Sequence, residues 1–387
     1  MSEESAYGVP RFEQGPIRPP SEAYSLLLRV TRNCPWNQCS FCPVYKGSKF
    51  SRRTVDEVKD DIRAMKHWAD QAKSISWRLG YGGEVNEHNA NQIYSHDPDN
   101  PYLRAILLWM LGSSKTAFLQ DADSLIIKPE DLADILGFFR KTFPSIERVT
   151  TYSRSSTLAR QTAEELGKLK NAGLDRVHVG LESGSDKVLK MMKKGATAEK
   201  HVTGGRRVKQ AGLELSEYVM PGLGGKQLSE EHAKDTAKVL NQIDPDFIRI
   251  RTLAVPPGAP LSEMVQKGEF EPPNDLEMAR ELRLFIENLN VHSTLVSDHM
   301  LNLFQELEGP LSEDRPKMLS TLDRFLEMDT KDQLVYIIGK RVGLFEKLSD
   351  LSDPSAYAKA EQTLDRLKVT SHQELQQVIN QVVSRFI

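Results

Sequence analysis

The sequence predicts an α/β protein: a partial (β/α)6 TIM-like barrel of parallel strands followed by a C-terminal all-helical region. Two observations support this prediction. Between about residues 121 and 255, short apolar runs alternate with longer amphipathic segments, which is typical of parallel strands joined by right-handed crossovers. After about residue 275 the strand pattern stops, and apolar residues recur at helical spacing instead.

Six apolar runs are the predicted strands. Each run is short and is bounded by polar residues or by glycine-containing turns. The runs lie at 24–30, 116–119, 148–152, 177–181, 213–220 and 247–253. Six parallel strands suit a full or partial barrel better than a small open sheet.

The predicted helices fill the intervals between these strands. They lie at 129–139, 162–172, 199–211 and 229–243. Pro129 suits a first helical turn, because its missing N–H has no intrahelical partner there. Gly173 and Gly212 are predicted C-terminal stops, because glycine readily adopts the left-handed backbone conformation that ends many helices.

We expect three regions along the chain. Residues 1–22 are polar and rich in glycine and proline, which predicts an extended N-terminal strap. Residues 23–274 are the predicted barrel, with a polar, turn-rich insertion at about 68–114. Residues 275–387 are the predicted C-terminal helical domain.

The composition predicts a cytoplasmic protein. The net charge is −3 and the cationic residues are dispersed, so we expect no nucleic-acid partner. No run approaches the roughly 20 apolar residues of a membrane span, and the first residues lack the apolar core of a signal peptide. Three cysteines are too few, and odd in number, for a secreted disulfide framework.

All three cysteines lie within one nine-residue stretch, at Cys34, Cys39 and Cys42. A structural zinc normally takes four protein ligands, and an iron–sulfur cluster normally takes four cysteines. Three closely spaced thiolates therefore predict a metal centre with one open coordination position. The cysteines follow the first predicted strand, and barrel enzymes place their sites in the loops after strands.

This arrangement resembles the radical S-adenosylmethionine (SAM) superfamily. The resemblance rests on a strand, a three-cysteine loop with Phe41 before its last cysteine, and a basic stretch leading into a helix. It covers roughly residues 24–257, apart from the insertion. The spacing here is C-x4-C-x2-C rather than the usual C-x3-C-x2-C. The helical tail is similar in organisation to the coproporphyrinogen dehydrogenase-like branch.

The resemblance implies an oxygen-sensitive enzyme with two cofactors, one 4Fe–4S cluster and SAM. Cys34, Cys39 and Cys42 would ligate the cluster. Reductive cleavage of SAM would give a 5′-deoxyadenosyl radical, which would abstract hydrogen from an unidentified organic small-molecule substrate. A flavodoxin- or ferredoxin-type donor would supply the electron.

The resemblance also implies which residues hold the cofactors. The superfamily has a Gly-Gly-Glu-like motif after its second strand, and two segments fit it here: residues 82–84, and residues 120–123, whose strand–helix context is the better one. The run Gly-Leu-Glu-Ser-Gly-Ser at 180–185 places a carboxylate at a strand end, where it would accept hydrogen bonds from the ribose. The implied cofactor-binding residues are Phe41, Gln120, Asp121, Ala122, Asp123, Ser153, Arg154, Glu182 and Leu253.

Catalytic residues are not identified by any motif. Asp298 and His299 are candidates because they follow a possible further strand at 291–296, although Asp298 also suits a helix N-cap. Glu84 is a candidate on the substrate side or a simple turn residue. The rival hypothesis is a non-catalytic metal-binding or redox-sensing module that uses the same three cysteines, including a zinc site completed by a distant histidine.

Overall fold

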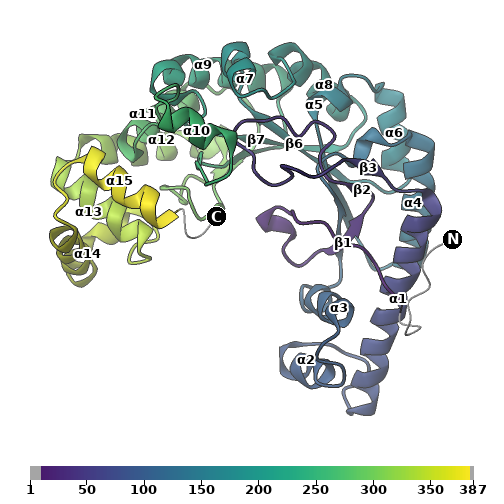
Figure 1. Cartoon of the computed structure of the whole chain (residues 1–387). Coiled ribbons are helices and arrows are strands. Elements are labelled where there is room, and N and C mark those ends of the chain that lie inside the picture. The colour runs from purple at the N-terminus through teal and green to yellow at the C-terminus, as the bar shows by residue number, and fades with distance from the viewer. Residues whose placement is uncertain (1–9, 384–387) are drawn as a thin grey trace. The chain divides into compact units, whose positions relative to one another are not determined.

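The computed structural model describes residues 10–383, and the chain forms two compact units (Figure 1). Within the described residues, the first unit comprises 10–35, 47–178 and 207–214. The second comprises 36–46, 179–206 and 215–383. The domain boundaries predicted at residues 22 and 274 stay a prediction.

The first unit contains a parallel sheet in the order β1–β4–β5–β6. Leu28 lies opposite Leu119, and Phe118 lies opposite Thr150. These four residues are fully buried, as expected for parallel strands covered on both faces. The strands are β1 (Leu26–Arg29), β4 (Thr116–Gln120), β5 (Arg148–Ser153) and the first part of β6 (Arg176–Glu182), with a separate two-stranded sheet of β2 (Thr31–Arg32) and β3 (Ser51–Arg52).

Helix α1 (Val55–Arg78) begins at a capping box, in which Thr54 and Glu57 satisfy each other's backbone N–H groups. Helix α4 (Pro129–Thr142) has Pro129 in its first turn, and Gly173 follows α6 (Ala163–Asn171) with φ of 111°, so both predicted helix limits are confirmed. The other helical elements of this unit are η1 (Pro20–Glu22), α2 (Glu87–Tyr94), α3 (Pro101–Leu111), η2 (Ser124–Ile126), α4 (Pro129–Thr142), α5 (Ser155–Leu158) and α6 (Ala163–Asn171).

Residues 68–114 are mostly helical, whereas the sequence suggested a turn-rich segment. They contain the end of α1 and all of α2 and α3, which lie alongside α1 in Figure 1. Ile93, Leu103 and Ile106 are buried. These apolar residues drive helix packing despite the many Asn, Asp and Gly residues around them. Asn86 and Asn100 are N-caps in the structure, so residues that looked like turn formers begin helices instead.

The second unit continues from β6 in the order β6–β7–β8–β9–β10. Strand β9 pairs in parallel with β8, and β10 pairs antiparallel with β9. The strands are β7 (Glu214–Val219), β8 (Phe247–Ile250), β9 (Thr294–Val296) and β10 (Gly309–Pro310). The α/β class is therefore confirmed, but the C-terminal region is not all-helical. Leu295 is fully buried, and its short apolar run adds a seventh parallel strand.

Helices follow β6, β7, β8 and β10, and the last helices form a C-terminal group that includes α13, α14 and α15 (Figure 1). Four buried aromatic rings pack in the C-terminal part: Phe304, Phe325, Tyr336 and Phe345. The helical elements are α7 (Asp186–Met191), α8 (Ala198–Gln210), α9 (Gly225–Ile243), α10 (Pro260–Gln266), α11 (Asp275–Glu287), α12 (Leu311–Glu327), α13 (Thr330–Arg341), η3 (Leu348–Ser352), α14 (Pro354–Leu367) and α15 (His372–Val383).

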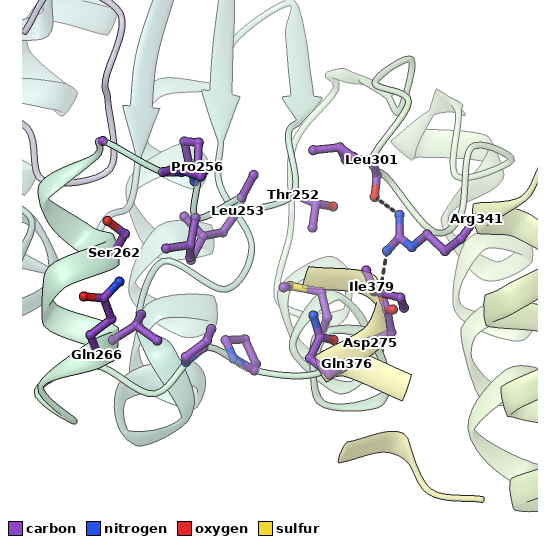
Figure 2. A pocket seen from close by; sticks show the side chains of 18 residues that line it. Thr252, Leu253, Pro256, Ser262, Gln266, Asp275, Leu301, Arg341, Gln376 and Ile379 are labelled. Carbon is purple, nitrogen blue, oxygen red and sulfur yellow. Dashed lines mark hydrogen bonds and ion pairs between the residues drawn. The ribbon is translucent and has the colours of Figure 1, made fainter. Parts of the chain in front are cut away.

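One ion pair ties helices α11 and α13 together. Arg341 lies 2.5 Å from Asp275 and donates a 2.7 Å hydrogen bond to the carbonyl oxygen of Leu301 (Figure 2). Across residues 10–383, no helix has both the length and the apolar character needed to cross a membrane.

Candidate cofactor site

The first part of the cysteine loop is held by a buried carboxylate. Asn33, directly before Cys34, has a left-handed backbone with φ of 67°, and its N–H donates a 2.8 Å hydrogen bond to Asp121. Its side chain donates to the carbonyl oxygen of Lys49 at 2.7 Å. The backbone at the entry to the loop is therefore fixed from both sides.

The second part of the loop is held by α7 and α10. The N–H of Ser40 donates to the carbonyl oxygen of Met192 at 2.9 Å, and the carbonyl oxygen of Ser40 accepts from Leu261 at 2.8 Å. The indole N–H of Trp36 donates to the carbonyl oxygen of Lys193 at 2.7 Å. These contacts order the backbone between the first and the last cysteine.

The donor set of the loop fits an iron–sulfur cluster with an open position. Cys34, Cys39 and Cys42 are partly exposed and none forms a disulfide bond, so all three sulfurs can become thiolate ligands. Among residues 10–383, no three His, Cys, Asp or Glu side chains converge closely enough to hold a metal ion. The case for a cluster here is therefore the chemistry and spacing of the donors.

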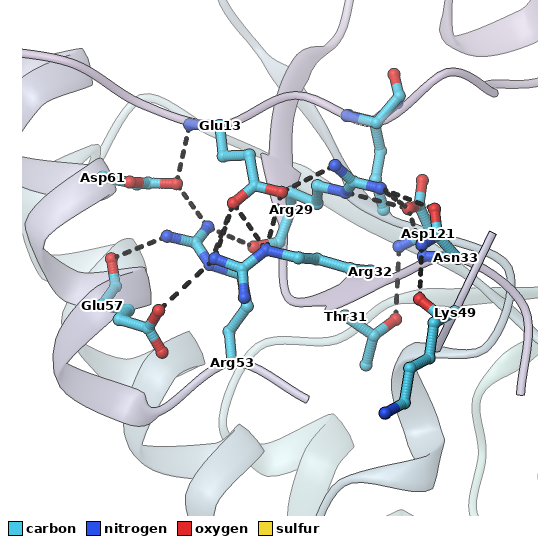
Figure 3. Close-up of polar contacts among 12 residues, drawn as sticks. Glu13, Arg29, Thr31, Arg32, Asn33, Lys49, Arg53, Glu57, Asp61 and Asp121 are labelled. Atoms are coloured by element: carbon cyan, nitrogen blue, oxygen red, sulfur yellow. Dashed lines mark hydrogen bonds and ion pairs between the residues drawn. The ribbon is translucent and has the colours of Figure 1, made fainter. Parts of the chain in front are cut away.

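A network of charges surrounds Asp121 in the first unit (Figure 3). Arg29 donates to Asp121 from Nε at 2.8 Å and from Nη2 at 2.5 Å, and to Glu13 from Nη1 at 2.6 Å. Glu13 also accepts from Arg32 at 2.8 Å, and its N–H donates to Asp61 at 2.9 Å. The strap thus contributes a carboxylate that lies among the arginines behind the cysteine loop.

Gln120 binds the strap itself. Its side chain accepts from the N–H of Gly15 at 2.9 Å and donates to the carbonyl oxygens of Gly15 and Ile17 at 3.0 and 2.7 Å. A Cβ atom at Gly15 would lie 1.9 Å from Asp121, so only glycine lets the strap pass here. Gln120 and Asp121 were both predicted to contact a cofactor. In the structure their side chains hydrogen-bond mainly to other protein groups, namely the strap, Arg29 and Asn33.

Asp123 joins the ends of β4 and β5. It accepts hydrogen bonds from Ser153 at 2.9 Å, from the N–H of Arg154 at 3.3 Å and from Thr157 at 2.6 Å. Burial raises the pKa of Asp123, and the Thr157 and Ser153 hydroxyls oppose that shift. The structure thus brings together three of the predicted residues, with half-buried Ala122 adjacent to Asp123.

Glu182 and Lys194 form an ion pair at the end of β6 in the second unit. Their charged atoms are 3.1 Å apart, and their side chains are only 12% and 13% exposed. Glu182 has a left-handed backbone with φ of 64°. A Cβ atom at Gly180 would lie 2.3 Å from the Glu182 carboxylate and 2.9 Å from the Lys194 ammonium. Glycine at 180 therefore makes room for this pair.

Glu217 on β7 is a second carboxylate near this pair. It is 1% exposed. Burial raises the pKa of Glu217 well above its ordinary value, Lys194 opposes the shift, and Glu182 adds to it. Lys194 therefore interacts with two carboxylates.

Replacing Glu217 with glutamine should make folding stability less sensitive to pH. A carboxyl group whose pKa is raised by folding stabilises the folded state fully when the pH is below its ordinary pKa of 4.5. This stabilisation declines as the pH rises through the pKa of the folded state. The slope is at most about 1.4 kcal/mol per pH unit. Between pH 5 and 8, thermal unfolding should show a flatter profile for Glu217→Gln than for the wild type. Exposed Glu199→Gln is the control, and a parallel profile for both variants would contradict the assignment.

Buried His232 links the turns that follow β6 and β7. Its Nε2 lies 3.0 Å from the carbonyl oxygen of Met220, which can only accept, so Nε2 carries the proton. Nδ1 lies 2.8 Å from the hydroxyl oxygen of Ser183 and forms a hydrogen bond with it. Glu281 on α11 accepts from the N–H of Gly222 at 2.6 Å. Helices α9 and α11 thus hold both turns.

Phe41 and Leu253 lie against a common apolar cluster in the second unit. Its buried members include Met192, Met220 and Leu261. The Lys194 ammonium lies 5.7 Å from the centre of the Phe41 ring. Both predicted residues therefore border one apolar region, and Phe41 reaches the Glu182–Lys194 pair through a cation–π contact.

The three catalytic candidates lie in different settings. Glu84 is exposed in the turn between α1 and α2, so the 82–84 segment does not follow a strand. Asp298 follows β9 and pairs with buried Arg249 at 2.7 Å. Burial and the nearby Arg251 together lower the pKa of His299 to about 4, although Asp298 opposes the shift.

Several site residues were not predicted from the sequence. They are Arg29, Lys194, Glu217, His232 and Glu281. Lys194 stands in a Lys-Lys-Gly run after the 180–185 segment, which was the one available signal. The others are isolated polar residues in apolar or amphipathic segments. Only the folded chain shows that Glu217, His232 and Glu281 are buried and that the Arg29 side chain is just 12% exposed beside Asp121.

Comparison with known proteins gives one family match. A family model described as the radical SAM superfamily matches residues 28–239, more than half of the chain. A tRNA uridine(34) acetyltransferase of Methanocaldococcus jannaschii is 23% identical over 284 residues, covering 70% of this chain and 50% of that protein. A tRNA-2-methylthio-N(6)-dimethylallyladenosine synthase of Bordetella avium is 25% identical over 319 residues, covering 80% and 57%.

Among solved structures, Elp3 of Methanocaldococcus infernus with an N-terminal deletion matches with a TM-score of 0.42 and 17% identity. That match covers 67% of this chain and 66% of the other. The chain spans about half the length of the curated relatives described above.

Proposed function

Because the chain belongs to the radical SAM superfamily, we propose that it cleaves SAM reductively at one 4Fe–4S cluster held by Cys34, Cys39 and Cys42. Members of this superfamily are enzymes that use such a cluster together with SAM. The predicted superfamily, enzyme class and cofactors are therefore confirmed at the level of the family. The nearer relation to the coproporphyrinogen dehydrogenase-like branch stays a prediction.

The observation that carries the proposal is the cysteine loop, with three thiols in nine residues directly after β1. Cys34, Cys39 and Cys42 would hold the cluster, which would supply the one electron needed for reductive cleavage of SAM to methionine and a 5′-deoxyadenosyl radical. A flavodoxin- or ferredoxin-type protein would supply that electron. The radical would then take a hydrogen atom from an organic substrate.

In the second unit, Glu182 would accept hydrogen bonds from the ribose hydroxyls of SAM. Lys194 is its cationic partner and would attract the SAM carboxylate. The apolar cluster beside Phe41 and Leu253 would keep water away from the adenosyl group. Gln120, Asp121, Ala122, Asp123, Ser153 and Arg154 remain proposed cofactor residues of the first unit.

His299 would act as a neutral imidazole. With a pKa of about 4, it is uncharged near pH 7 and can accept a proton from a substrate group. Asp298, already paired with Arg249, would orient the segment that carries His299. Glu84 stays a candidate on the substrate side.

Replacing Glu182 with glutamine should raise the KM for SAM without loss of iron. A hydrogen bond to a charged acceptor contributes about 1.5–3 kcal/mol, so the change should be about 10- to 100-fold. The measurement is initial deoxyadenosine formation against SAM concentration. Exposed Glu230→Gln on α9 is the control. An unchanged KM would contradict the role given to Glu182.

Replacing His232 with phenylalanine should raise the KM for SAM by about tenfold, because the turns after β6 and β7 lose their common anchor. The fold should also lose about 1–3 kcal/mol of stability, because Ser183 and Met220 lose a buried partner. His232→Gln can restore the donor to Met220 and should recover part of the KM. A variant that is destabilised but keeps the wild-type KM would show that His232 only supports the fold.

The composition supports a small organic substrate rather than a nucleic acid. The net charge is −3, and lysines and arginines are spread along the chain, so no cationic stripe suited to RNA is concentrated in the sequence. Both curated relatives described above have names that refer to tRNA, which makes tRNA the substrate class to test against. Faster deoxyadenosine formation on addition of tRNA would reject the small-molecule assignment.

The direct test is anaerobic reconstitution with iron and sulfide, followed by SAM and dithionite. We expect a reduced-cluster signal in electron paramagnetic resonance that changes when SAM is added, together with formation of 5′-deoxyadenosine. Bound zinc without deoxyadenosine would favour the rival metal-binding or redox-sensing module. The comparisons give no support to that rival.

A further inference from the structure

A cavity of about 390 Å³ lies in the second unit, beyond the end of β8 (Figure 2). It is bounded by the loop after β8, by α10, by the start of α11 and by α15. Its volume is within the range of sites for small organic ligands. Of the predicted cofactor residues, only Leu253 lines it, so the cavity adjoins the proposed cofactor site at that residue and is bounded elsewhere by other residues.

Most of the cavity wall is apolar and rigid. Leu253, Val255, Met278 and Ile379 contribute aliphatic surface, and prolines such as Pro256 and Pro273 form parts of the backbone on either side. Proline fixes its own φ angle, so these segments have little freedom to collapse into the space. Such a wall favours a flat or compact apolar body.

One end of the cavity is polar. Arg341 and Asp275 lie there as an ion pair at 2.5 Å, with side chains 14% and 8% exposed. Arg341 also donates to the carbonyl oxygen of Leu301 at 2.7 Å. In Figure 2 the guanidinium group reaches the cavity from α13, and Asp275 lies next to it. A hydrogen-bond donor and an acceptor therefore stand side by side.

The charges at this end neutralise each other, and no other charged side chain lines the cavity within the described residues. A charged ligand would have to leave water for an apolar space or compete with a partner that is already bound, and both are unfavourable. A neutral group with a donor and an acceptor on one edge, such as a carboxamide or the edge of a heterocycle, can bond to the pair without breaking it.

We infer that this cavity is a binding site for an uncharged, largely apolar ring compound that carries a carboxamide-like donor–acceptor edge. The apolar body would lie against Pro273 and Met278, and the edge would meet Arg341 and Asp275. This inference goes beyond the proposed radical chemistry. Binding of this ligand needs neither SAM nor a reductant, so the binding measurement can be interpreted even if the proposed radical chemistry is wrong.

Three probes of nearly equal shape test the ligand class: 2-naphthamide, 2-naphthoate and 2-naphthylmethylamine. Isothermal titration calorimetry with the anaerobically purified full chain should show one site for the neutral amide, with a Kd below about 1 mM. The anion and the cation should bind at least about tenfold more weakly. No binding of the amide at its solubility limit, or equal binding of the anion, would overturn the inference.

Matched variants test the location. Met278→Trp should fill the cavity and weaken amide binding at least about tenfold, whereas Met300→Trp makes the same change at a residue that is 73% exposed and outside the lining. Gln266 lines the cavity from the exposed face of α10, so a tryptophan there should fill part of the cavity without disturbing the core. Gln266→Trp should therefore weaken binding, and it keeps the test valid if Met278→Trp unfolds the protein. Unchanged affinity in Gln266→Trp and in a folded Met278→Trp would overturn the location.

Discussion

Replacing Cys39 with alanine should remove the cluster and reduce deoxyadenosine formation at least about 100-fold. Two thiolates cannot hold a cluster that needs three protein ligands, and the chain has no fourth cysteine to substitute for the missing one. The measurements are iron and sulfide per chain after anaerobic reconstitution, and deoxyadenosine after addition of SAM and dithionite. The same loss should follow at Cys34 and Cys42.

Ser40→Ala is the matched control for this prediction. Ser40 stands directly beside Cys39, is 2% exposed, and contacts Met192 and Leu261 through its backbone. The alanine variant should keep those contacts and therefore keep full iron. Full iron in Cys39→Ala, or loss of iron in Ser40→Ala, would show that the thiols are not the ligands.

Replacing Arg29 with methionine should destabilise the protein by about 3–5 kcal/mol, because it leaves Asp121 as a buried charge without its cationic partner. The Asp121 side chain is fully buried and that of Arg29 is 12% exposed. The measurement is the free energy of unfolding from urea titrations followed by circular dichroism. Reconstituted iron should also fall, since Asp121 fixes the backbone before Cys34.

Arg63→Met is the control for this ion pair. Arg63 pairs with Asp60 on α1, but both side chains are more than half exposed, so the loss should be less than about 0.5 kcal/mol. The double variant Arg29→Met with Asp121→Leu should recover part of the stability, because no buried charge is left unpaired. Equal effects of Arg29→Met and Arg63→Met would refute the structural role of the Arg29–Asp121 pair.

Much of the fold is predictable from local sequence signals. Each predicted strand of the barrel is present, and Pro129, Gly173 and Gly212 lie at helix limits as expected. These signals are readable because parallel strands are apolar on both faces and because proline and glycine constrain the backbone directly. The secondary structure of residues 68–114 is harder to predict from the sequence, because Asn86 and Asn100 suit a turn and a helix N-cap equally well.

The candidate site is only partly predictable. The cysteine loop and Glu182 stand in compact motifs, so residue type and spacing identify them. Arg29, Glu217 and His232 are single polar residues whose burial depends on segments far away in the chain. Their importance comes from desolvation and from specific partners, and neither property is encoded in a local pattern. The strap shows this most clearly, since Glu13 reaches Arg29 only in the folded chain.

The confinement of every thiol to the loop has a practical consequence. The three cysteines are partly exposed and none is in a disulfide bond, so a maleimide dye would report on this loop alone. A ligated sulfur reacts poorly with such reagents. Counting labelled sulfurs by mass spectrometry would therefore give the fraction of chains that carry the metal centre, without an engineered tag and without background from elsewhere in the chain.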